Sequence, residues 1–291
     1  MSDRISDSSL SIVIPAKNEA GAIGDVVAGA RARFPQAELI VVDDGSEDDT
    51  GGVAEAAGAT VLRHPVSLGN GAAVKAGARR ATGELLAFMD GDGQHSAEDL
   101  ERLIQRLDDG FAMVIGARSV AGHANVGRLV ANGLYNRVAS AMTGQDIYDL
   151  TSGFRVAKAE LFRRFLYLLP NGFSYPTTIT MAFLRSGFPI DFQPITVGKR
   201  EGKSHIRPLR DGLRFLVIIF KIATLYSPLK LFVPTSGLFL ATGLSYYAYT
   251  YLTMGRFTNM SMLIISAAVI IFLIGLISEQ ITALTFSRNQ D

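Results

Sequence analysis

Two long uncharged runs toward the C-terminal end constrain the fold of this chain more than any other feature. No charged residue occurs between Lys230 and Arg256, and a second uncharged run extends from Phe257 to Ser278. A helix of either length crosses a hydrocarbon core of roughly 30 Å, whereas the buried core helices of soluble proteins are usually shorter. We therefore predict transmembrane helices over residues 231–255 and 257–284, with a buried helical hairpin as the alternative.

The sequence that leads into the first run is rich in cations. They are Lys199, Arg200, Lys203, Arg207, Arg210, Arg214, Lys221 and Lys230, whereas the turn between the runs carries only Arg256. The positive-inside rule then predicts an integral membrane protein whose N-terminal part is cytoplasmic. Residues 206–230 mix cations and apolar residues at roughly helical spacing, which predicts juxtamembrane helices along the membrane surface. Packing of this stretch into a protein core is the alternative.

The composition limits the classes of protein to which this chain can belong. The 291 residues allow one large domain or two modest ones, and a net charge of +1 argues against a broad nucleic-acid-binding surface. Cysteine is absent, which excludes a disulfide framework and a thiolate metal site. The N-terminal stretch MSDRISDSSL has no apolar core, so it does not have the pattern of a secretory signal.

Strand and helix patterns alternate over residues 1–205. Strands are expected at 10–16, 37–46, 59–64, 84–92 and 111–118, and helices at 19–34, 48–58, 69–83 and 96–110. This alternation predicts one α/β domain with a mostly parallel sheet and helices on both faces. Ligands of such sheets bind beyond the carboxyl ends of the strands. The polar residues that fall there are Asn18, Glu19, Asp43, Asp44, Asp90, Asp92 and Arg118.

The stretch FMDGDGQHS places two carboxylates at the end of an apolar strand. If the strand continues through them, Asp90 and Asp92 point the same way and can converge on one cation. Oxygen ligands suit Mg²⁺ or Mn²⁺, and Gln94 can add an amide oxygen. The alternative is an acidic turn that caps the next helix, with Ser96 as the N-cap. The four histidines, His64, His95, His123 and His205, have no metal-ligand spacing and are taken as non-ligands.

Several motifs in order resemble a known family. SIVIPAKNEA, VVDDGSEDDT, LGNGAAVKAG and FMDGDGQHSAEDL resemble the motifs of inverting family 2 glycosyltransferases with the nucleotide-diphospho-sugar transferase (GT-A) fold. DLTSGFRV and KREGKSHI, followed by the paired apolar runs, are similar to the polyprenyl-phosphate group, which includes dolichol-phosphate mannose synthases and undecaprenyl-phosphate hexose transferases. The resemblance covers nearly the whole chain.

That resemblance implies a reaction and its partners. A hexose would pass, with inversion, from a nucleotide sugar to the phosphate of a membrane polyprenol on the cytoplasmic leaflet. The cofactor would be Mg or Mn. LGNGAAVKAG favours a UDP-sugar, with GDP-mannose as the second candidate. Relatives with two crossings also associate as tetramers, which makes a homo-oligomer an expectation.

The resemblance also implies roles for single residues. The donor-binding segment matches Pro15, Ala16, Glu19, Asp44, Asp90, Gly91 and Asp92, and the metal site matches Asp90, Asp92 and Gln94. Gly91 departs from the DADxQ pattern of some relatives. The acceptor-phosphate residues match Arg118, Arg128 and Arg200, to which Lys203 is added as a candidate, and the catalytic group is Asp92, Arg118 and Arg200. Lys75 follows a glycine-rich helix start, which can receive phosphate, and is expected in the donor site.

The chemistry of the acceptor agrees with this choice of residues. A phosphate monoester is mostly dianionic at neutral pH, so it is already a nucleophile and needs no general base. It needs cations that bring two anions together, and arginine suits that task. Asp149 either orients the acceptor or caps a local turn. A processive polysaccharide synthase, a non-catalytic membrane scaffold and a nucleotidyltransferase are the competing functions. The first is disfavoured because the chain has no tryptophan, which the Q-x-x-R-W motif requires.

Overall fold

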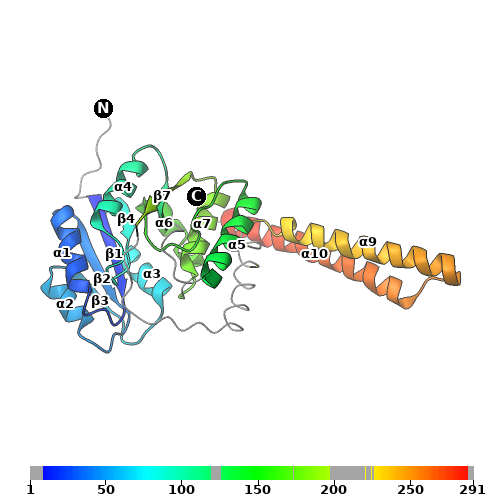
Figure 1. Ribbon diagram of the computed structural model, residues 1–291, viewed down its shortest axis with the longest axis horizontal. Coiled ribbons are helices and arrows are strands. Elements are labelled where there is room, and N and C mark those ends of the chain that lie inside the picture. Colours follow the sequence, from blue (N-terminus) through cyan, green and yellow to red (C-terminus); the bar gives the residue numbers. More distant parts are fainter. Residues whose placement is uncertain are drawn as a thin grey trace. The chain divides into compact units, whose positions relative to one another are not determined.

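The computed structural model describes residues 9–118, 126–172, 174–196, 220, 224 and 226–287, with only the backbone for 126–132 and 287. These residues belong to two compact units. The first lies within residues 1–140 and 145–212, and the second within 141–144 and 213–291. Figure 1 shows the first unit as a sheet flanked by helices and the second as dominated by a long helical hairpin.

A seven-stranded sheet forms the centre of the first unit, in the order β3-β2-β1-β4-β6-β5-β7. The strands are β1 (Leu10–Ala16), β2 (Glu38–Asp43), β3 (Thr60–Arg63), β4 (Leu85–Phe88), β5 (Met113–Arg118), β6 (Arg155–Lys158) and β7 (Ile190–Ile195). β6 runs antiparallel to β4 and β5, and all other pairings are parallel. The predicted α/β domain with a mostly parallel sheet is therefore confirmed.

Helices cover both faces of this sheet (Figure 1). On one face, α1 (Ile23–Arg33), α2 (Thr50–Ala56) and α4 (Ala97–Leu107) contribute apolar residues to one core cluster that includes Ile12 and Ile14 of β1. On the other face lie α3 (Asn70–Arg80), α6 (Ala159–Arg164) and α7 (Tyr175–Arg185). Phe88 of β4 stacks on Phe162 of α6 there, with ring centroids 4.6 Å apart. The chain also forms α5 (Val126–Thr143) and a short 3-10 turn, η3 (Leu166–Leu168).

β4 is shorter than predicted. The apolar pattern extended the strand over residues 84–92, but it ends at Phe88, and the residues from Asp90 to Gln94 turn away with Gly93 at a φ of 73°. Asp90 and Asp92 therefore lie on a loop, and strand alternation is not what orients them. The glycines between and after them allow this turn. The capping alternative also holds, because Ser96 Oγ accepts a hydrogen bond from Asp99 N at 3.1 Å.

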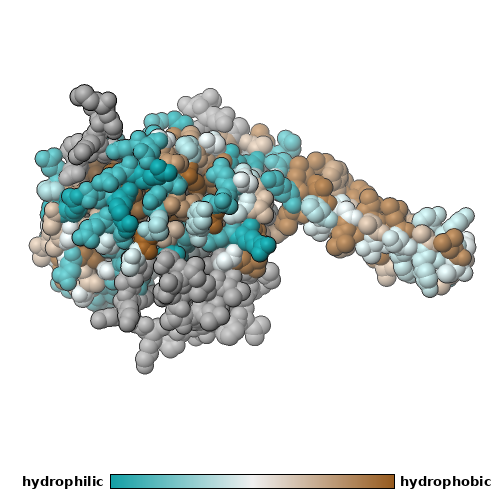
Figure 2. All heavy atoms as spheres, turned by 45° about the horizontal axis from the view of Figure 1, so that its top comes forward, coloured by the Kyte–Doolittle hydropathy of each residue, from teal (hydrophilic) through white to brown (hydrophobic). Residues whose placement is uncertain are grey.

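The second unit contains α9 (Leu229–Met254) and α10 (Asn259–Ser287). Two glycines allow the pair to pack closely: a Cβ at Gly243 would lie 2.8 Å from Ile265 Cγ1, and one at Gly275 would lie 2.6 Å from Phe232 Cβ. Ser236 Oγ donates across the pair to Ala268 O at 2.9 Å. The exposed face seen in Figure 2 is mainly hydrophobic along the hairpin and paler toward its tip.

Within the described part of the chain, one helix is long and apolar enough to cross a membrane by length and composition, over Asn259–Phe286 of α10. α9 covers the other predicted span, but four tyrosines and several hydroxyl side chains make it less apolar. Its crossing therefore stays a prediction. Most of the predicted juxtamembrane segment, and with it the proposed surface helices, lies outside the described residues.

The contact of α3 with β1 gives a direct test of the packing. A Cβ at Gly77 would lie 2.3 Å from Val13 Cγ1, and Val13 is fully buried. Because overpacking a core typically costs 1–3 kcal/mol, Gly77→Ala is expected to destabilise the first unit by about that amount. The control is Gly29→Ala, at an exposed helical site with nothing within 4 Å. It should stabilise by about 0.5–1 kcal/mol, since glycine is the poorer helix former. Thermal unfolding of the purified protein measures both, and equal shifts would contradict the packing.

Candidate functional site

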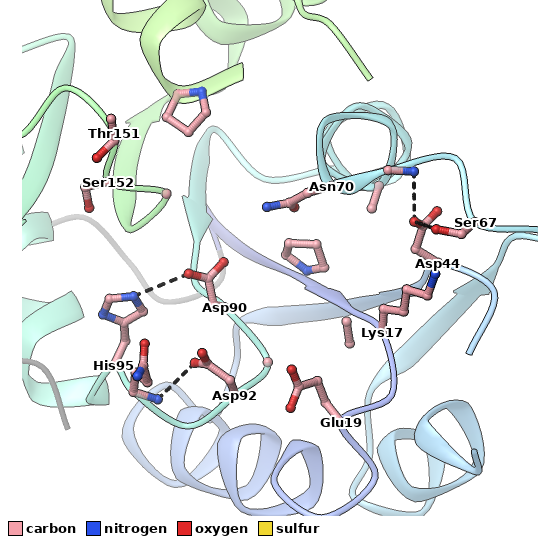
Figure 3. Close-up of a pocket in the computed structure, with 18 of the residues that line it drawn as sticks. Lys17, Glu19, Asp44, Ser67, Asn70, Asp90, Asp92, His95, Thr151 and Ser152 are labelled. Carbon is pink, nitrogen blue, oxygen red and sulfur yellow. Dashed lines mark hydrogen bonds and ion pairs between the residues drawn. The ribbon is translucent and has the colours of Figure 1, made fainter. Parts of the chain in front are cut away.

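A cavity of about 480 Å³ lies at the carboxyl edge of the sheet. Its walls come from the ends of β1 and β5, from residues that follow β1, β2 and β4, from the loop between β3 and α3, from the start of α3 and from the loop that precedes β6. Because β6 is antiparallel, the residues before it, rather than those after it, reach this edge. Figure 3 shows Asp90 and Asp92 between Thr151 and Ser152 on one side and Asp44 and Ser67 on the other.

Two carboxylates lie near the middle of the cavity. Asp92 Oδ1 accepts a hydrogen bond from Gln94 N at 3.2 Å, and Asp90 Oδ2 lies 3.6 Å from His95 Nε2. The Asp90 side chain is 41% exposed, so it is open to a ligand. A Cβ at Gly91 would lie 3.1 Å from Ala16 Cβ, so this glycine allows the loop to lie close against β1.

The oxygen donors in this loop fit a divalent cation. No group of three or more His, Asp or Glu side chains in the described ranges is arranged to hold a metal by itself. Mg²⁺ sites commonly have one or two carboxylates, with phosphate oxygens of the substrate and water as the other ligands. Gly153 also faces Asp90: a Cβ there would lie 3.6 Å from Asp90 Oδ1. The absence of a side chain at Gly153 therefore leaves space beside this carboxylate.

Asp44 organises the other side of the cavity. Its oxygens accept hydrogen bonds from Ser67 Oγ, Leu68 N and Gly69 N, each at 2.8 Å, and Oδ1 lies 2.7 Å from His64 Nδ1. Burial alone would raise the pKa of Asp44, but the hydrogen bonds outweigh burial and lower it to about 2. Asp44 is thus held ionised, and it fixes the loop that leads into α3.

Arg118 and Asp149 form a bidentate ion pair at the cavity wall. Arg118 Nε and Nη2 donate to the two Asp149 oxygens at 2.7 and 3.0 Å, and Nη2 also donates to Thr151 Oγ1 at 2.7 Å. Burial would lower the pKa of Arg118, but Asp149 raises it above its ordinary value. Burial would likewise raise the pKa of Asp149, but Arg118 lowers it. The capping alternative for Asp149 is confirmed, because Thr151 N and Oγ1 both donate to its Oδ1. Asp149 also holds Arg118, and a role in orienting the acceptor stays a prediction.

The structure brings most of the predicted site residues together. Those that line the cavity are Pro15, Ala16, Glu19, Asp44, Asp90, Gly91, Asp92, Gln94 and Arg118. Lys75 was expected there but does not line it. Its Nζ donates to Leu169 O at 3.0 Å and to Asn171 Oδ1 at 2.6 Å, so it ties α3 to the loop before α7. Arg200 and Lys203 lie outside the described residues, as does the side chain of Arg128, whose backbone belongs to α5.

Other lining residues were not foreseen as site residues. They are Lys17, Ser67, Gly69, Asn70, Ala73, His95, Thr151, Ser152, Gly153 and Pro176. His95 has no metal-ligand spacing in the sequence, yet its ring stacks on that of Phe154 with centroids 4.5 Å apart, and its Nε2 lies 3.6 Å from Asp90 Oδ2. The motif DLTSGF contained the signal for the residues from Thr151 to Gly153, but only the antiparallel direction of β6 brings them to this edge.

Comparison with known proteins agrees with this architecture. The model of the family described as "Glycosyl transferase family 2" matches residues 11–166, and the "GtrB C-terminal hairpin" model matches residues 227–284. The first match covers more than half of the chain, and relatives of similar length support it. The chain therefore belongs to glycosyl transferase family 2.

Two relatives show the extent of the similarity. The polyprenol monophosphomannose synthase of Mycolicibacterium smegmatis is 30% identical over 228 residues, which cover 73% of this chain and 84% of that protein. Glycosyltransferase AglJ of Haloferax volcanii is 31% identical over 244 residues, which cover 82% of this chain and 80% of that protein.

Among solved structures, a similar one is glucosyl-3-phosphoglycerate synthase from Mycobacterium tuberculosis in complex with Mn²⁺, uridine diphosphate and phosphoglyceric acid. It aligns with a TM-score of 0.59 at 25% identity, over 74% of this chain and 77% of that one. The first unit thus has a GT-A-like fold.

The Asp44 network predicts a particular acid response. Because the pKa of Asp44 is lowered, its contribution to stability is complete above 3.8 and is lost as the pH falls toward 2. Asp44→Asn should lack this part of the acid-induced loss of stability. His64→Ala removes one hydrogen-bond partner of Asp44, so the same loss of stability should occur at higher pH. Denaturant unfolding at a series of pH values over this range measures how the free energy of unfolding changes with pH. Parallel profiles for wild type and Asp44→Asn would refute the assignment.

Proposed function

We propose that this protein transfers a hexose from a nucleotide sugar to the phosphate of a membrane polyprenol, with a divalent cation held by Asp90 and Asp92. One observation carries the proposal: a single cavity contains a pair of carboxylates suited to a cation and a guanidinium suited to an anion. The family membership supports glycosyl transfer. We favour a UDP-sugar as donor, with GDP-mannose second, and inversion at the anomeric carbon.

The proposed chemistry divides between the two sides of the cavity. The acceptor phosphate oxygen forms a bond to the anomeric carbon while the bond from that carbon to the donor diphosphate breaks, and the nucleoside diphosphate leaves with the electron pair. A bound cation would stabilise the charge that develops on this leaving group. Arg118, held in place by Asp149, would receive the acceptor phosphate. Its Nε and Nη2 are engaged, whereas Nη1 makes no hydrogen bond within the described residues and remains for a ligand.

Two further kinds of observation support a lipid acceptor. The C-terminal region matches a hairpin model, and α10 meets the length and composition of a membrane span. The names of the relatives include a polyprenol monophosphomannose synthase and, from Micrococcus luteus, an undecaprenyl-phosphate mannosyltransferase, which is 31% identical over 65% of this chain. We infer a catalytic unit on the cytoplasmic leaflet, with Arg128, Arg200 and Lys203 as further candidates for the acceptor site. A processive synthase and a non-catalytic scaffold remain the alternatives.

A transfer assay tests the proposal. The purified protein in detergent, with Mn²⁺ or Mg²⁺ and a polyprenyl phosphate, is offered UDP-glucose, UDP-galactose, UDP-glucuronate and GDP-mannose in turn. We expect a lipid-linked sugar from one donor. Asp92→Ala should lower the rate by roughly 100-fold or more, because it removes a ligand of the cation that stabilises the leaving group.

Asp25→Ala is the matched control, since Asp25 is exposed on α1 and does not line the cavity. It should keep the wild-type rate. Release of nucleotide without a lipid product would indicate a different acceptor. Folded protein that turns over none of the donors would favour the scaffold.

A further inference from the structure

Buried polar atoms without a hydrogen-bond partner concentrate at this one site. Among the residues that the structure describes, they are Asn70 Oδ1, His95 Nδ1, Ser152 Oγ and Arg155 Nε. The first three residues line the cavity, and Arg155 follows Ser152 by three positions. Leaving such a group unsatisfied costs about 1–3 kcal/mol, so native proteins rarely do so without a reason. Their grouping around one cavity indicates that a ligand supplies the missing partners.

Ser152 is the most informative of these residues. The residue is only 2% exposed, its Oγ is unpartnered, and it belongs to the cavity wall. The adjacent Thr151 differs, because its Oγ1 already bonds Asp149 and Arg118. A serine hydroxyl can donate one hydrogen bond and accept others, which matches a sugar hydroxyl. An unpaired hydroxyl in such a place is thus a recognition group for a neutral polar ligand.

The order of groups along the cavity indicates which part of the donor Ser152 meets. Figure 3 shows Asp90 between Ser152 on one side and Asp44 on the other. If the diphosphate lies at Asp90 and Asp92, and the nucleoside on the Asp44 side, the sugar extends toward Ser152. That is also the side of Arg118, whose Nη2 donates to Thr151 Oγ1 and which would receive the acceptor phosphate. This step rests on the proposed function.

Arg155 fixes the backbone that presents Ser152. Its side chain is fully buried, and Nη2 donates to Ser152 O while Nη1 donates to Pro176 O at 3.3 Å and to Thr180 Oγ1 at 3.1 Å. These bonds join the loop before β6 to α7. No carboxylate of the described residues lies within 4.0 Å of Arg155. Burial lowers its pKa to about 10, so it remains charged at neutral pH. A fully buried guanidinium is costly to desolvate, and the charges of Asp149 and Asp90 offset part of that cost from beyond ion-pair distance.

We propose that Ser152 binds a hydroxyl of the transferred sugar and that Arg155 is the positioning residue that holds Ser152 in place. Neither role was anticipated from the sequence. Ser152 would then help to set sugar specificity, because a site built to hydrogen-bond a hydroxyl discriminates strongly against a ligand that lacks it.

Binding measurements on the full chain in detergent with Mn²⁺ test this proposal. The probes are two pairs, UDP with UDP-glucose and GDP with GDP-mannose. The readout is the affinity ratio, which is the affinity for the nucleotide sugar divided by the affinity for the free nucleotide, within the pair that wild type binds. Ser152→Ala should weaken binding of the nucleotide sugar by about 5- to 20-fold and leave binding of the free nucleotide unchanged. Its melting temperature without ligand should stay the same or rise, because an unsatisfied buried hydroxyl is removed.

Ser11→Ala is the matched control. Ser11 is also fully buried, but its Oγ donates to Glu38 Oε2 at 2.6 Å and accepts from Gly83 N at 2.9 Å. This variant should lower the melting temperature and leave the affinity ratio unchanged.

Arg155→Lys keeps the charge but loses the planar fork of donors, so it should lower the affinity ratio as Ser152→Ala does. Combined with Ser152→Ala, it should add no further loss to that ratio. An additive loss would overturn the positioning role of Arg155.

The outcomes also separate this inference from the proposed function. If wild type binds a nucleotide sugar and Ser152→Ala binds it equally well, the Ser152 assignment is overturned and the proposed function stands. If wild type binds nucleotide and nucleotide sugar with equal affinity, the proposal that Ser152 binds a hydroxyl of the sugar is also overturned. If wild type binds none of the four probes, donor use itself fails, and the inference fails with it.

Discussion

Parallel pairing of β1 with both β2 and β4 is the constraint on which the site depends. It aligns three strands of buried aliphatic residues so that the chain leaves all of them at one edge. Asp44 follows β2, and Asp90 and Asp92 follow β4, so the sheet collects acids that are far apart in the sequence. Without this pairing, neither the network around Asp44 nor the carboxylate pair would face a common cavity.

Charge compensation explains how so polar a cavity remains stable. Hydrogen bonds keep Asp44 ionised, and Asp149 and Arg118 neutralise each other at the opposite wall. Asp90 is more exposed, and within the described residues it has no such partner beyond the adjacent His95. Asp44 and Asp149 are therefore held by fixed partners, whereas Asp90 and the Nη1 group of Arg118 are open to a ligand.

The sequence allowed much of this to be predicted, for physical reasons that also explain the errors. The apolar runs of β1 and β2 identify buried strands directly, and Ser96 with Asp99 identifies the start of α4. The end of β4 was placed too late, because Met89 continues the apolar run although glycines turn the backbone immediately after it. The place of Ser152 in the cavity and the tie between Lys75 and Leu169 depend on contacts between distant segments, which no local pattern contains.

The reversed direction of β6 has an evolutionary consequence. A loop that follows a parallel strand leads into a helix packed on the sheet, so a change in its length disturbs that packing. The loop before β6 instead ends in a short strand fixed on both sides by β4 and β5. Its residues can vary while the loops that carry Asp44, Asp90 and Asp92 remain intact. Selection could therefore alter one wall of the cavity independently of the other, and new specificities could arise on an unchanged scaffold.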